Sequence, residues 1–311
     1  MSKIPVVVIA GPTGVGKTAA SIELAKRTEG EIISADSMQI YRGMDIGTAK
    51  VTPDEMQGVP HHLIDIADPK ENYSVYRFVS DCKKVAESIL SRGKLPIIVG
   101  GTGLYIDSFL SDIDFTEVRS DENYRRKLES LAEEKGNEYV HDMLKAADPA
   151  SAESIHPNNL KRVIRALEYY KTTNTTISSH NEETKKKASP YSCCYICLTR
   201  DRDELYERID KRVDIMLEKG LIDEVKKLLE AGCTREHTSM QALGYKEIID
   251  YLEGTVSFDE AVETLKRDSR RYAKRQLTWF RRRDDALWIN LTDTPNPVDI
   301  CAEYIRTKLK R

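Results

Sequence analysis

The chain has 311 residues, a formal net charge of −3, 40% hydrophobic residues and 32% charged residues. This is the composition of an ordinary globular protein, long enough for a core domain and a smaller one. The near balance of charge excludes attraction of nucleic acid over the whole surface, so any such binding must come from local basic faces. No stretch approaches the roughly 20 apolar residues of a membrane span, and the N-terminal apolar run is too short for a signal peptide. We therefore expect a cytoplasmic protein that contacts no membrane.

Strands and helices alternate in the first part of the chain. The apolar runs with the length of buried strands are 4–10, 31–37, 95–101 and 191–200. Helical periods lie between them, at 17–27 and at 75–91. This alternation predicts an α/β fold in which helices wind around a parallel sheet, with ligands at the carboxyl ends of the strands.

Between about 115 and 187 the strand pattern is absent, and the sequence is charged with helical periods. The helices predicted there are 121–135, 137–146 and 158–171. Because a strand follows this stretch, we interpret 116–187 as a helical domain inserted into a core made of 1–115 and 188–311.

After the last of these strands the chain is helical again. The helical periods that stop at a glycine are 203–219 and 221–231. Ser257 and Glu260 have the spacing of a capping box, in which each side chain satisfies a backbone donor of the other residue. A further helix is therefore predicted to begin there.

The sequence GPTGVGKT directly follows the first strand and precedes a helix. It fits the pattern G-x-x-x-x-G-K-[ST], in which glycines let backbone N–H groups turn toward a phosphate chain at a helix N-terminus. Lys17 would supply a positive charge and Thr18 a hydroxyl for Mg²⁺. The predicted phosphate-binding residues are Gly11, Pro12, Thr13, Gly14, Val15, Gly16, Lys17 and Thr18. With this loop, the predicted fold is a P-loop NTPase-like sheet with a helical insertion domain and a helical C-terminal part.

The third strand ends differently from its counterpart in P-loop kinases and hydrolases. There an apolar strand ends in an acid that holds the water shell of the metal, whereas here the strand ends in Gly100 and Gly101. The glycines through Gly103 indicate either a close backbone approach at the site or a tight turn, with Thr102 at a helix start. The nearest acid at the same sheet edge is Asp36, and spacing alone leaves open whether Asp36 is functional or solvated.

Two basic stretches favour contact with RNA. Lys161, Arg162 and Arg165 share one face of the helix predicted at 158–171. Residues 266–283 hold nine Lys or Arg and one acid, with aromatic residues between them. Basic charge binds phosphates, and aromatic rings stack on splayed bases. A solvated helix whose aromatic residues face the core is the alternative for the second stretch.

Two smaller features have more than one interpretation. Arg208 and Arg212 are four apart on the helix predicted at 203–219, from which they would either reach bound phosphates or pair with nearby acids. Cys194 and Cys197 form a lone C-x-x-C within the fourth strand, which favours small core residues over a metal site.

These motifs together resemble the tRNA dimethylallyltransferase family. The stretches that match, in the family's order, are GPTGVGKT (11–18), ISADSMQIYRGMDIGTAK (33–50), PHHLIDI (60–66), PIIVGGTGLY (96–105), HPNNLKRVIRALE (156–168), QALGYKEI (241–248) and AKRQLTWFRR (273–282). Eukaryotic members carry a C-terminal zinc finger that this sequence does not have, so the resemblance is to the bacterial form.

The resemblance implies transfer of a dimethylallyl group from dimethylallyl diphosphate to N6 of adenosine-37 in tRNA, with release of pyrophosphate. The phosphate loop then holds the donor diphosphate rather than ATP. The general base of the family corresponds to Asp36, and Thr102 would position the amine. Lys17, the loop amides and Mg²⁺ on Thr18 would stabilise the leaving pyrophosphate. The arginines among which its further partner stays open are Arg208, Arg212 and Arg275.

The resemblance also implies how tRNA is bound. The residues that it assigns to tRNA contact are Asp36, Ser37, Met38, Gln39, Thr102, Arg125, Lys161, Arg162, Val163, Ile164, Arg165 and Arg275. The inserted domain would close over the anticodon stem, and the target adenosine would be flipped out of its stack. Mg²⁺ is the one cofactor expected, and the protein is expected to be a monomer.

Three other functions are compatible with parts of the sequence. An adenylate isopentenyltransferase would use the same donor but a free nucleotide as acceptor. A small-molecule kinase with a helical lid would transfer the γ-phosphate of ATP. A non-enzymatic RNA-binding module would bind tRNA in a salt-sensitive manner without forming a product. The choice of acceptor and the fate of ATP separate these possibilities.

Overall fold

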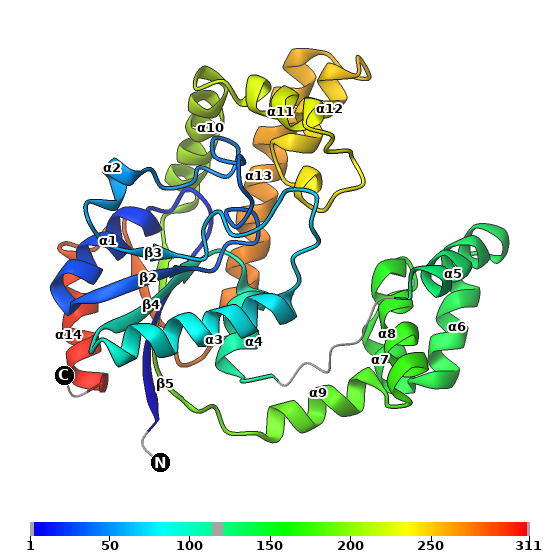
Figure 1. Ribbon diagram of the computed structural model, residues 1–311, viewed down its shortest axis with the longest axis horizontal. Helices are drawn as coiled ribbons and strands as arrows, with labels where there is room; N and C mark the ends of the chain where they lie inside the picture. Colours follow the sequence, from blue (N-terminus) through cyan, green and yellow to red (C-terminus); the bar gives the residue numbers. More distant parts are fainter. Residues whose placement is uncertain (1–2, 114–120, 310–311) are drawn as a thin grey trace. The chain divides into compact units, whose positions relative to one another are not determined.

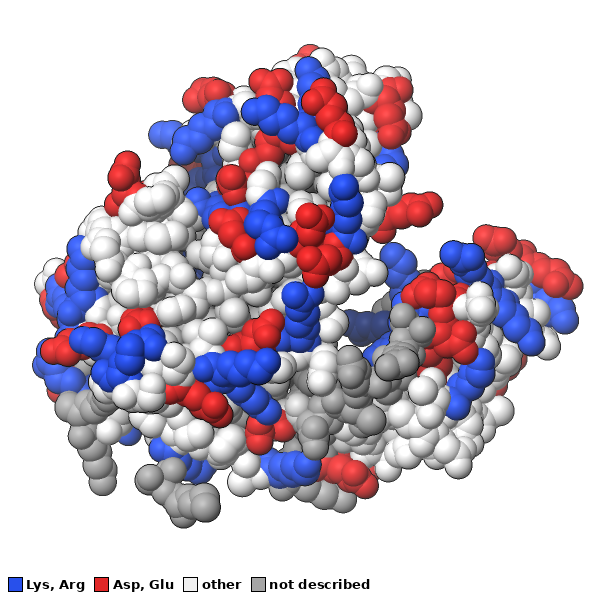
Figure 2. Space-filling model, in the orientation of Figure 1, with Lys and Arg blue, Asp and Glu red and all other residues white. Residues whose placement is uncertain are grey.

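The chain folds as two compact units, 1–110 with 190–311 and 111–189. The computed structural model (Figure 1) describes residues 3–113 and 121–309. Within these described ranges, every helix is too short or too polar to cross a lipid bilayer. On the face drawn in Figure 2, Lys and Arg side chains are interspersed with Asp and Glu. This mixture fits the small net charge of −3.

The larger unit is built on a six-stranded parallel sheet with the order β3-β2-β4-β1-β5-β6. The strands are β1 (Ile4–Ala10), β2 (Gly30–Ser34), β3 (His61–His62), β4 (Leu95–Gly100), β5 (Tyr191–Thr199) and β6 (Leu287–Asn290). The predicted parallel sheet is confirmed, and the four predicted strands are β1, β2, β4 and β5. The second strand stops at Ser34 rather than at 37, so Asp36 lies in the loop that follows. The edge strands β3 and β6 were not predicted.

Some helices of the larger unit pack against the sheet, and others pack mainly on one another (Figure 1). They are α1 (Lys17–Thr28), α2 (Pro53–Met56), α3 (Val75–Ser91), α4 (Gly103–Leu110), α10 (Arg202–Glu218), α11 (Leu221–Glu230), α12 (Tyr245–Leu252), α13 (Phe258–Phe280) and α14 (Pro297–Leu309), with the 3₁₀ helix η1 (Ser239–Gln241). The predicted capping box begins α13, because Ser257 accepts from the Glu260 amide and the Glu260 carboxylate accepts from the Ser257 amide. Such a cap satisfies donors that the first helical turn leaves unpaired.

The core of this unit places β1 at its centre. Val7 is fully buried and lies between Ile97 of β4 and Cys194 of β5 in the strand register. Cys194 and Cys197 are also fully buried, which confirms them as core residues. Because β1 is central and buried, the loop at its carboxyl end is fixed in the middle of the sheet edge where ligands bind in α/β folds.

The smaller unit is a helical assembly with a core of its own. Its helices are α5 (Glu122–Lys135), α6 (Asn137–Ala147), α7 (Pro149–Ser154), α8 (Leu160–Thr173) and α9 (Ile177–Lys186). The three predicted helices correspond to α5, α6 and α8, whereas α7 and α9 were not predicted. Apolar side chains from these helices, such as Leu128, Val140 and Val163, form one buried cluster.

Candidate active site

A cavity of about 720 Å³ lies within the larger unit at the carboxyl edge of the sheet. Its walls come from the loop after β1, the loop after β2, residues 47–49 and helices α10 and α13. The predicted site residues that line it are Thr13, Gly14, Gly16, Lys17, Thr18, Asp36, Ser37, Met38, Gln39, Arg208, Arg212 and Arg275. Phosphate-loop residues, Asp36 and the three arginines are therefore brought to one site.

The phosphate loop turns through backbone conformations that favour glycine. Gly14 has a φ of 78° and Gly16 a φ of 110°, both in the left-handed region. The Nζ atom of Lys17 donates hydrogen bonds to the carbonyl oxygens of Gly11, at 2.9 Å, and Pro12, at 2.8 Å. The ammonium group is therefore held against the start of the loop.

Not every residue of the motif faces the cavity. Val15 is fully buried in the core behind the loop, and Gly11 and Pro12 are buried as well. None of the three lines the cavity. Gly11, Pro12 and Val15 pack the loop against the core, and their part in phosphate binding through the backbone stays a prediction.

The charges in the cavity act on one another. Burial and, to a smaller extent, the positive charge of Arg212 lower the pKa of the Lys17 ammonium to about 8, and the Asp36 carboxylate opposes both. Burial also lowers the pKa of Arg212, again opposed by Asp36. Two positive charges that are close together and shielded from water favour the binding of a ligand with more than one negative charge.

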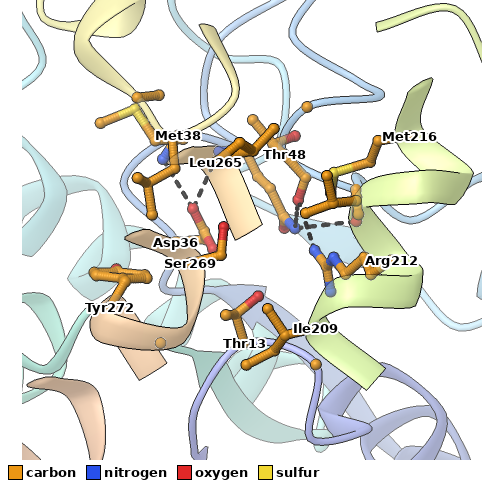
Figure 3. A pocket seen from close by; sticks show the side chains of 18 of the residues that line it. Thr13, Asp36, Met38, Thr48, Ile209, Arg212, Met216, Leu265, Ser269 and Tyr272 are labelled. Carbon is orange, nitrogen blue, oxygen red and sulfur yellow. Dashed lines mark hydrogen bonds between the residues drawn. The ribbon is translucent and has the colours of Figure 1, made fainter. Parts of the chain in front are cut away.

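The carboxylate of Asp36 is held by the backbone of its own loop. Its Oδ1 atom accepts hydrogen bonds from the Met38 amide at 2.9 Å and from the Gln39 amide at 3.4 Å. Figure 3 shows Asp36 beside Ser269 and Tyr272 of α13. Both amides bind Oδ1, so Oδ2 is available to a group in the cavity.

Thr102 holds the loop after β2, which contains Asp36, through two hydrogen bonds. Its Oγ1 atom accepts a hydrogen bond from the Ser37 amide at 3.1 Å, and its own amide donates to the carbonyl of Ala35 at 3.2 Å. Thr102 does not line the cavity. Thr102 fixes the residues on either side of Asp36, and its predicted part in positioning the acceptor amine stays a prediction.

The glycines around Thr102 are required by contacts within the protein. A Cβ atom at Gly100 would lie 2.1 Å from the Ala35 carbonyl oxygen, and one at Gly103 would lie 2.2 Å from the Trp279 ring. The close backbone approach expected at this turn is thus an approach to other parts of the chain. Among these glycines, Gly101 lines the cavity.

The arginines of α10 fasten the loops that surround the cavity. The Nε atom of Arg208 donates to the carbonyl oxygen of Gly14 at 3.0 Å, and Arg212 donates to the carbonyl oxygen of Thr48 at 3.3 Å. Figure 3 places Arg212 and Thr48 on the same side of the cavity. Since each bond uses one N–H of a guanidinium with five donors, both arginines keep donors for an anion.

The basic tract on α13 divides between structural and cavity-facing roles. Arg270 pairs with Asp210 at 2.5 Å and Lys266 pairs with Asp214 at 2.6 Å, which joins α13 to α10. The Phe280 ring is fully buried. For these residues the alternative of a helix with paired charges and core-facing aromatics is correct.

Tyr272 and Arg275 of the same tract face the cavity instead. The Arg275 guanidinium lies 5.6 Å from the centre of the Tyr272 ring. Burial, together with the nearby Asp36 carboxylate, raises the pKa of Tyr272 to about 12, and its hydrogen bonds with Thr102 and Gln276 oppose this. Tyr272 therefore stays a neutral hydroxyl at physiological pH, next to the acid.

Sequence reasoning missed two residues that shape the site. Gln276 lines the cavity and its carboxamide oxygen accepts a hydrogen bond from the Thr13 amide at 2.9 Å. Glu224 of α11 accepts from the amides of residues 45–47, at 2.9, 2.7 and 3.0 Å. Its partner Tyr245 donates to the same carboxylate at 2.6 Å. Glu224 therefore holds the segment that includes the cavity residues 47–49.

The smaller unit does not present all of its predicted tRNA-contacting residues. Val163 is fully buried and Ile164 is 4% exposed, so their side chains belong to the core and the expectation for them is corrected. Arg125 and Arg165 both pair with the fully buried Glu168, at 2.9 Å each. Lys161 and Arg162 are exposed on α8. The predicted contacts on α8 are therefore divided between a face packed into the core and a charged face. They are Lys161, Arg162, Val163, Ile164 and Arg165.

The family is decided by comparison with known proteins. A family model described as "IPP transferase" matches residues 39–283, and one described as "Isopentenyl transferase" matches residues 4–68. The chain belongs to the IPP transferase family. A curated relative of this family from Lachnoclostridium phytofermentans, named tRNA dimethylallyltransferase, is 55% identical over 97% of this chain and 96% of its own. One of the same name from Acetivibrio thermocellus is 56% identical over 92% of this chain and 91% of its own.

Solved structures of IPP transferase relatives have the same fold. The full-length tRNA isopentenylpyrophosphate transferase of Bacillus halodurans is 50% identical, with a TM-score of 0.74 and coverage of 99% of both chains. A eukaryotic dimethylallyltransferase acting on tRNA is 34% identical, with a TM-score of 0.80, over 93% of this chain and 74% of that one. The α/β fold of this chain is thus that of its family.

Proposed function

We propose that this chain transfers the dimethylallyl group of dimethylallyl diphosphate to N6 of adenosine-37 in tRNA and releases pyrophosphate. The observation that carries the proposal is a single cavity with a phosphate loop and Lys17 on one side and the Asp36 carboxylate on the other. Membership in the IPP transferase family, with relatives named tRNA dimethylallyltransferase, supports it.

The donor diphosphate is bound by the phosphate loop. Lys17, Arg208 and Arg212 all line the cavity and supply positive charge where negative charge grows as pyrophosphate leaves. Charges and N–H groups that are fixed in advance stabilise such a transition state without rearranging. They also bind the diphosphate oxygens before the reaction, which orients the allylic carbon toward Asp36.

A Mg²⁺ ion fits this site beside Thr18. The Thr18 side chain is exposed and lines the cavity. The described part of the chain contains no group of three or more His, Cys, Asp and Glu residues placed to hold a metal. Mg²⁺ commonly binds through substrate phosphates and water with few protein ligands, so one hydroxyl is a sufficient protein contribution. When bound, the ion neutralises charge on the diphosphate.

The acceptor amine needs a proton acceptor. The lone pair of adenine N6 is shared with the ring, so the amine becomes an effective nucleophile only if its proton is accepted as the N–C bond forms. Asp36 is held through Oδ1 by the Met38 and Gln39 amides, which presents Oδ2 to the cavity. We assign Asp36 the role of general base.

The adenosine must leave its stack to reach this acid. Flipping a nucleotide costs a few kcal/mol, which contacts in the pocket have to offset. Ser37, Met38 and Gln39 line the cavity beside Asp36, and Tyr272 faces it from α13. We assign these residues to the base, and the exposed Lys161 and Arg162 of the 111–189 unit to tRNA phosphates.

The proposal extends to the oligomeric state of the protein and to its location in the cell. The phosphate loop, Asp36 and three arginines of one chain already form the cavity, so a second copy is not needed to complete it, and we propose that the protein acts as a monomer. A tRNA-modifying enzyme must share a compartment with its substrate, so we place it in the cytoplasm.

The test is an acceptor assay with the purified protein. Unmodified tRNA, dimethylallyl diphosphate and Mg²⁺ should yield N6-dimethylallyl adenosine by mass analysis of tRNA nucleosides, with one pyrophosphate per product. AMP as the acceptor is the matched comparison and should yield far less product. Unmodified tRNA alongside prenylated AMP, or alongside consumption of ATP, would contradict the proposal.

A further inference from the structure

Gln276 connects the phosphate loop to the turn that follows β4. Its Oε1 atom accepts a hydrogen bond from the Thr13 amide at 2.9 Å, and its Nε2 atom donates to the carbonyl oxygen of Gly101 at 2.9 Å. The side chain is 6% exposed, and the little that remains faces the cavity. A buried carboxamide with both ends bonded is held in one orientation.

The Gln276 carboxamide packs tightly against the turn that follows β4. A Cβ atom at Gly101 would lie 2.2 Å from the Gln276 Nε2 atom and 3.6 Å from the Gly11 carbonyl oxygen. β4 is the direct neighbour of β1 in the sheet, so the turn after β4 and the phosphate loop lie next to each other. Gln276 therefore fills the gap between two loops that both end at the ligand edge of the sheet.

In nucleoside triphosphatases with this loop, that gap has another occupant. The γ-phosphate lies between the loop lysine and the end of the neighbouring strand, where an acid holds the metal. Here the neighbouring strand ends in Gly100 and Gly101, and the Thr13 amide already has a partner. The hydrogen bond of the residue 13 amide is thus already made within the protein.

We propose that Gln276 is the residue that fits this phosphate loop to a diphosphate and excludes a triphosphate. Its carboxamide oxygen accepts the hydrogen bond of the Thr13 amide, and the carboxamide fills the space that a third phosphate would need. The Val15 amide is bonded to the Pro12 carbonyl, so the amides of Gly14, Gly16, Lys17 and Thr18 and the Lys17 ammonium remain for two phosphates. This inference rests on the proposed use of the loop for the donor diphosphate, and it explains how a loop shared with ATP-using enzymes selects a prenyl donor.

The test compares two inorganic probes, pyrophosphate and tripolyphosphate, each with Mg²⁺, by calorimetric titration of the full chain. The variants are Gln276→Ala and Gln276→Asn, in which the carboxamide is removed or drawn back by one methylene. Asn keeps a polar group in the buried position and serves if the Ala variant does not fold. The control is Thr278→Ala on the same helix, where the hydroxyl is exposed and bonds only within α13, to the Lys274 carbonyl.

The ratio of the two affinities decides the inference. In the wild type and the Thr278 control, pyrophosphate should bind at least as tightly as tripolyphosphate. In the Gln276 variants the ratio should move roughly 10-fold toward tripolyphosphate, because one freed amide can bond the third phosphate. An unchanged ratio in both variants would overturn the inference, whatever the acceptor assay shows. A changed ratio in a protein that does not prenylate tRNA would leave it standing and remove the proposed function.

Discussion

Asp36 is the residue on which the proposed chemistry depends most. In Asp36→Asn the side chain can still accept hydrogen bonds from the Met38 and Gln39 amides, so the loop should keep its shape. It can no longer take a proton from the amine, and kcat should fall by about 10²- to 10⁴-fold. Single-turnover prenylation measures the rate, and filter binding measures tRNA affinity, which should change little.

An unchanged single-turnover rate in that variant would remove Asp36 as the base. A loss of tRNA affinity as large as the loss of rate would assign Asp36 to binding alone. The two readouts therefore separate a chemical role from a positional one.

The lowered pKa of Lys17 predicts how the use of the donor depends on pH. Burial and Arg212 lower its pKa to about 8, so in the free enzyme it is charged below that pH and neutral above it. Since the charge binds the diphosphate, kcat/KM for the donor should fall as pH rises through about 8. A bound diphosphate stabilises the charged form and raises this pKa. The value of kcat at saturating donor should therefore show no fall in the same range, and a fall of equal size in both would contradict this role.

At the scale of single residues, the sequence pointed to residues that belong to a motif and missed residues whose partners are distant in the chain. Lys17 belongs to the phosphate-loop motif, Asp36 was assigned through the family resemblance, and Arg212 was one of three arginines left open. Gln276 could not be predicted, since its partner Thr13 is 263 positions away and only the fold brings them together. Glu224 was not singled out in the sequence, because its burial against backbone amides depends on tertiary structure.

At the scale of elements, long segments with a clear hydrophobic period could be predicted from the sequence, and short edge strands could not. The long buried strands and α3 were predicted because burial on both faces or a 3.6-residue period is a clear pattern. β3 has two residues and β6 has four, too few for any period to show. Helix α8 and its basic face were predicted, and Lys161 and Arg162 are exposed there. The core face was not predicted, because Val163 and Ile164, which were expected to contact tRNA, pack into the core.

The smaller unit makes a prediction at this scale, at Glu168 of α8. This carboxylate is fully buried and accepts from Arg125, Arg165 and the Asp121 amide. Both arginines are partly exposed, so Glu168→Gln should lower the free energy of unfolding by about 2 kcal/mol, less than for a fully buried pair. Denaturant unfolding of the full chain measures it. Glu133→Gln on exposed α5 surface is the control. A loss no larger than the control's would contradict this account of the unit.

At the scale of the whole molecule, composition placed tRNA binding in local basic faces, and the exposed cations of α8 are the ones to test. Replacing Lys161 and Arg162 by alanine should raise KM for tRNA roughly 10-fold and reduce the salt dependence of binding by about one unit of slope per residue. The value of kcat should stay unchanged, because neither residue lines the cavity. An unchanged salt slope would exclude this helix as a phosphate contact.

The two-unit organisation followed from one observation in the sequence, a charged helical stretch between two strands of one sheet. The boundaries in the structure are 110/111 and 189/190. The central claim concerns the larger unit, where one cavity would hold a leaving diphosphate and an acid for the incoming base.

A crystal structure with an unreactive thio-analogue of the donor and an anticodon stem-loop tests that claim most directly. The account predicts the diphosphate on the amides of Gly14, Gly16, Lys17 and Thr18 and adenine N6 about 3 Å from the Asp36 carboxylate. A diphosphate bound elsewhere, or an adenine whose N6 points away from Asp36, would contradict it.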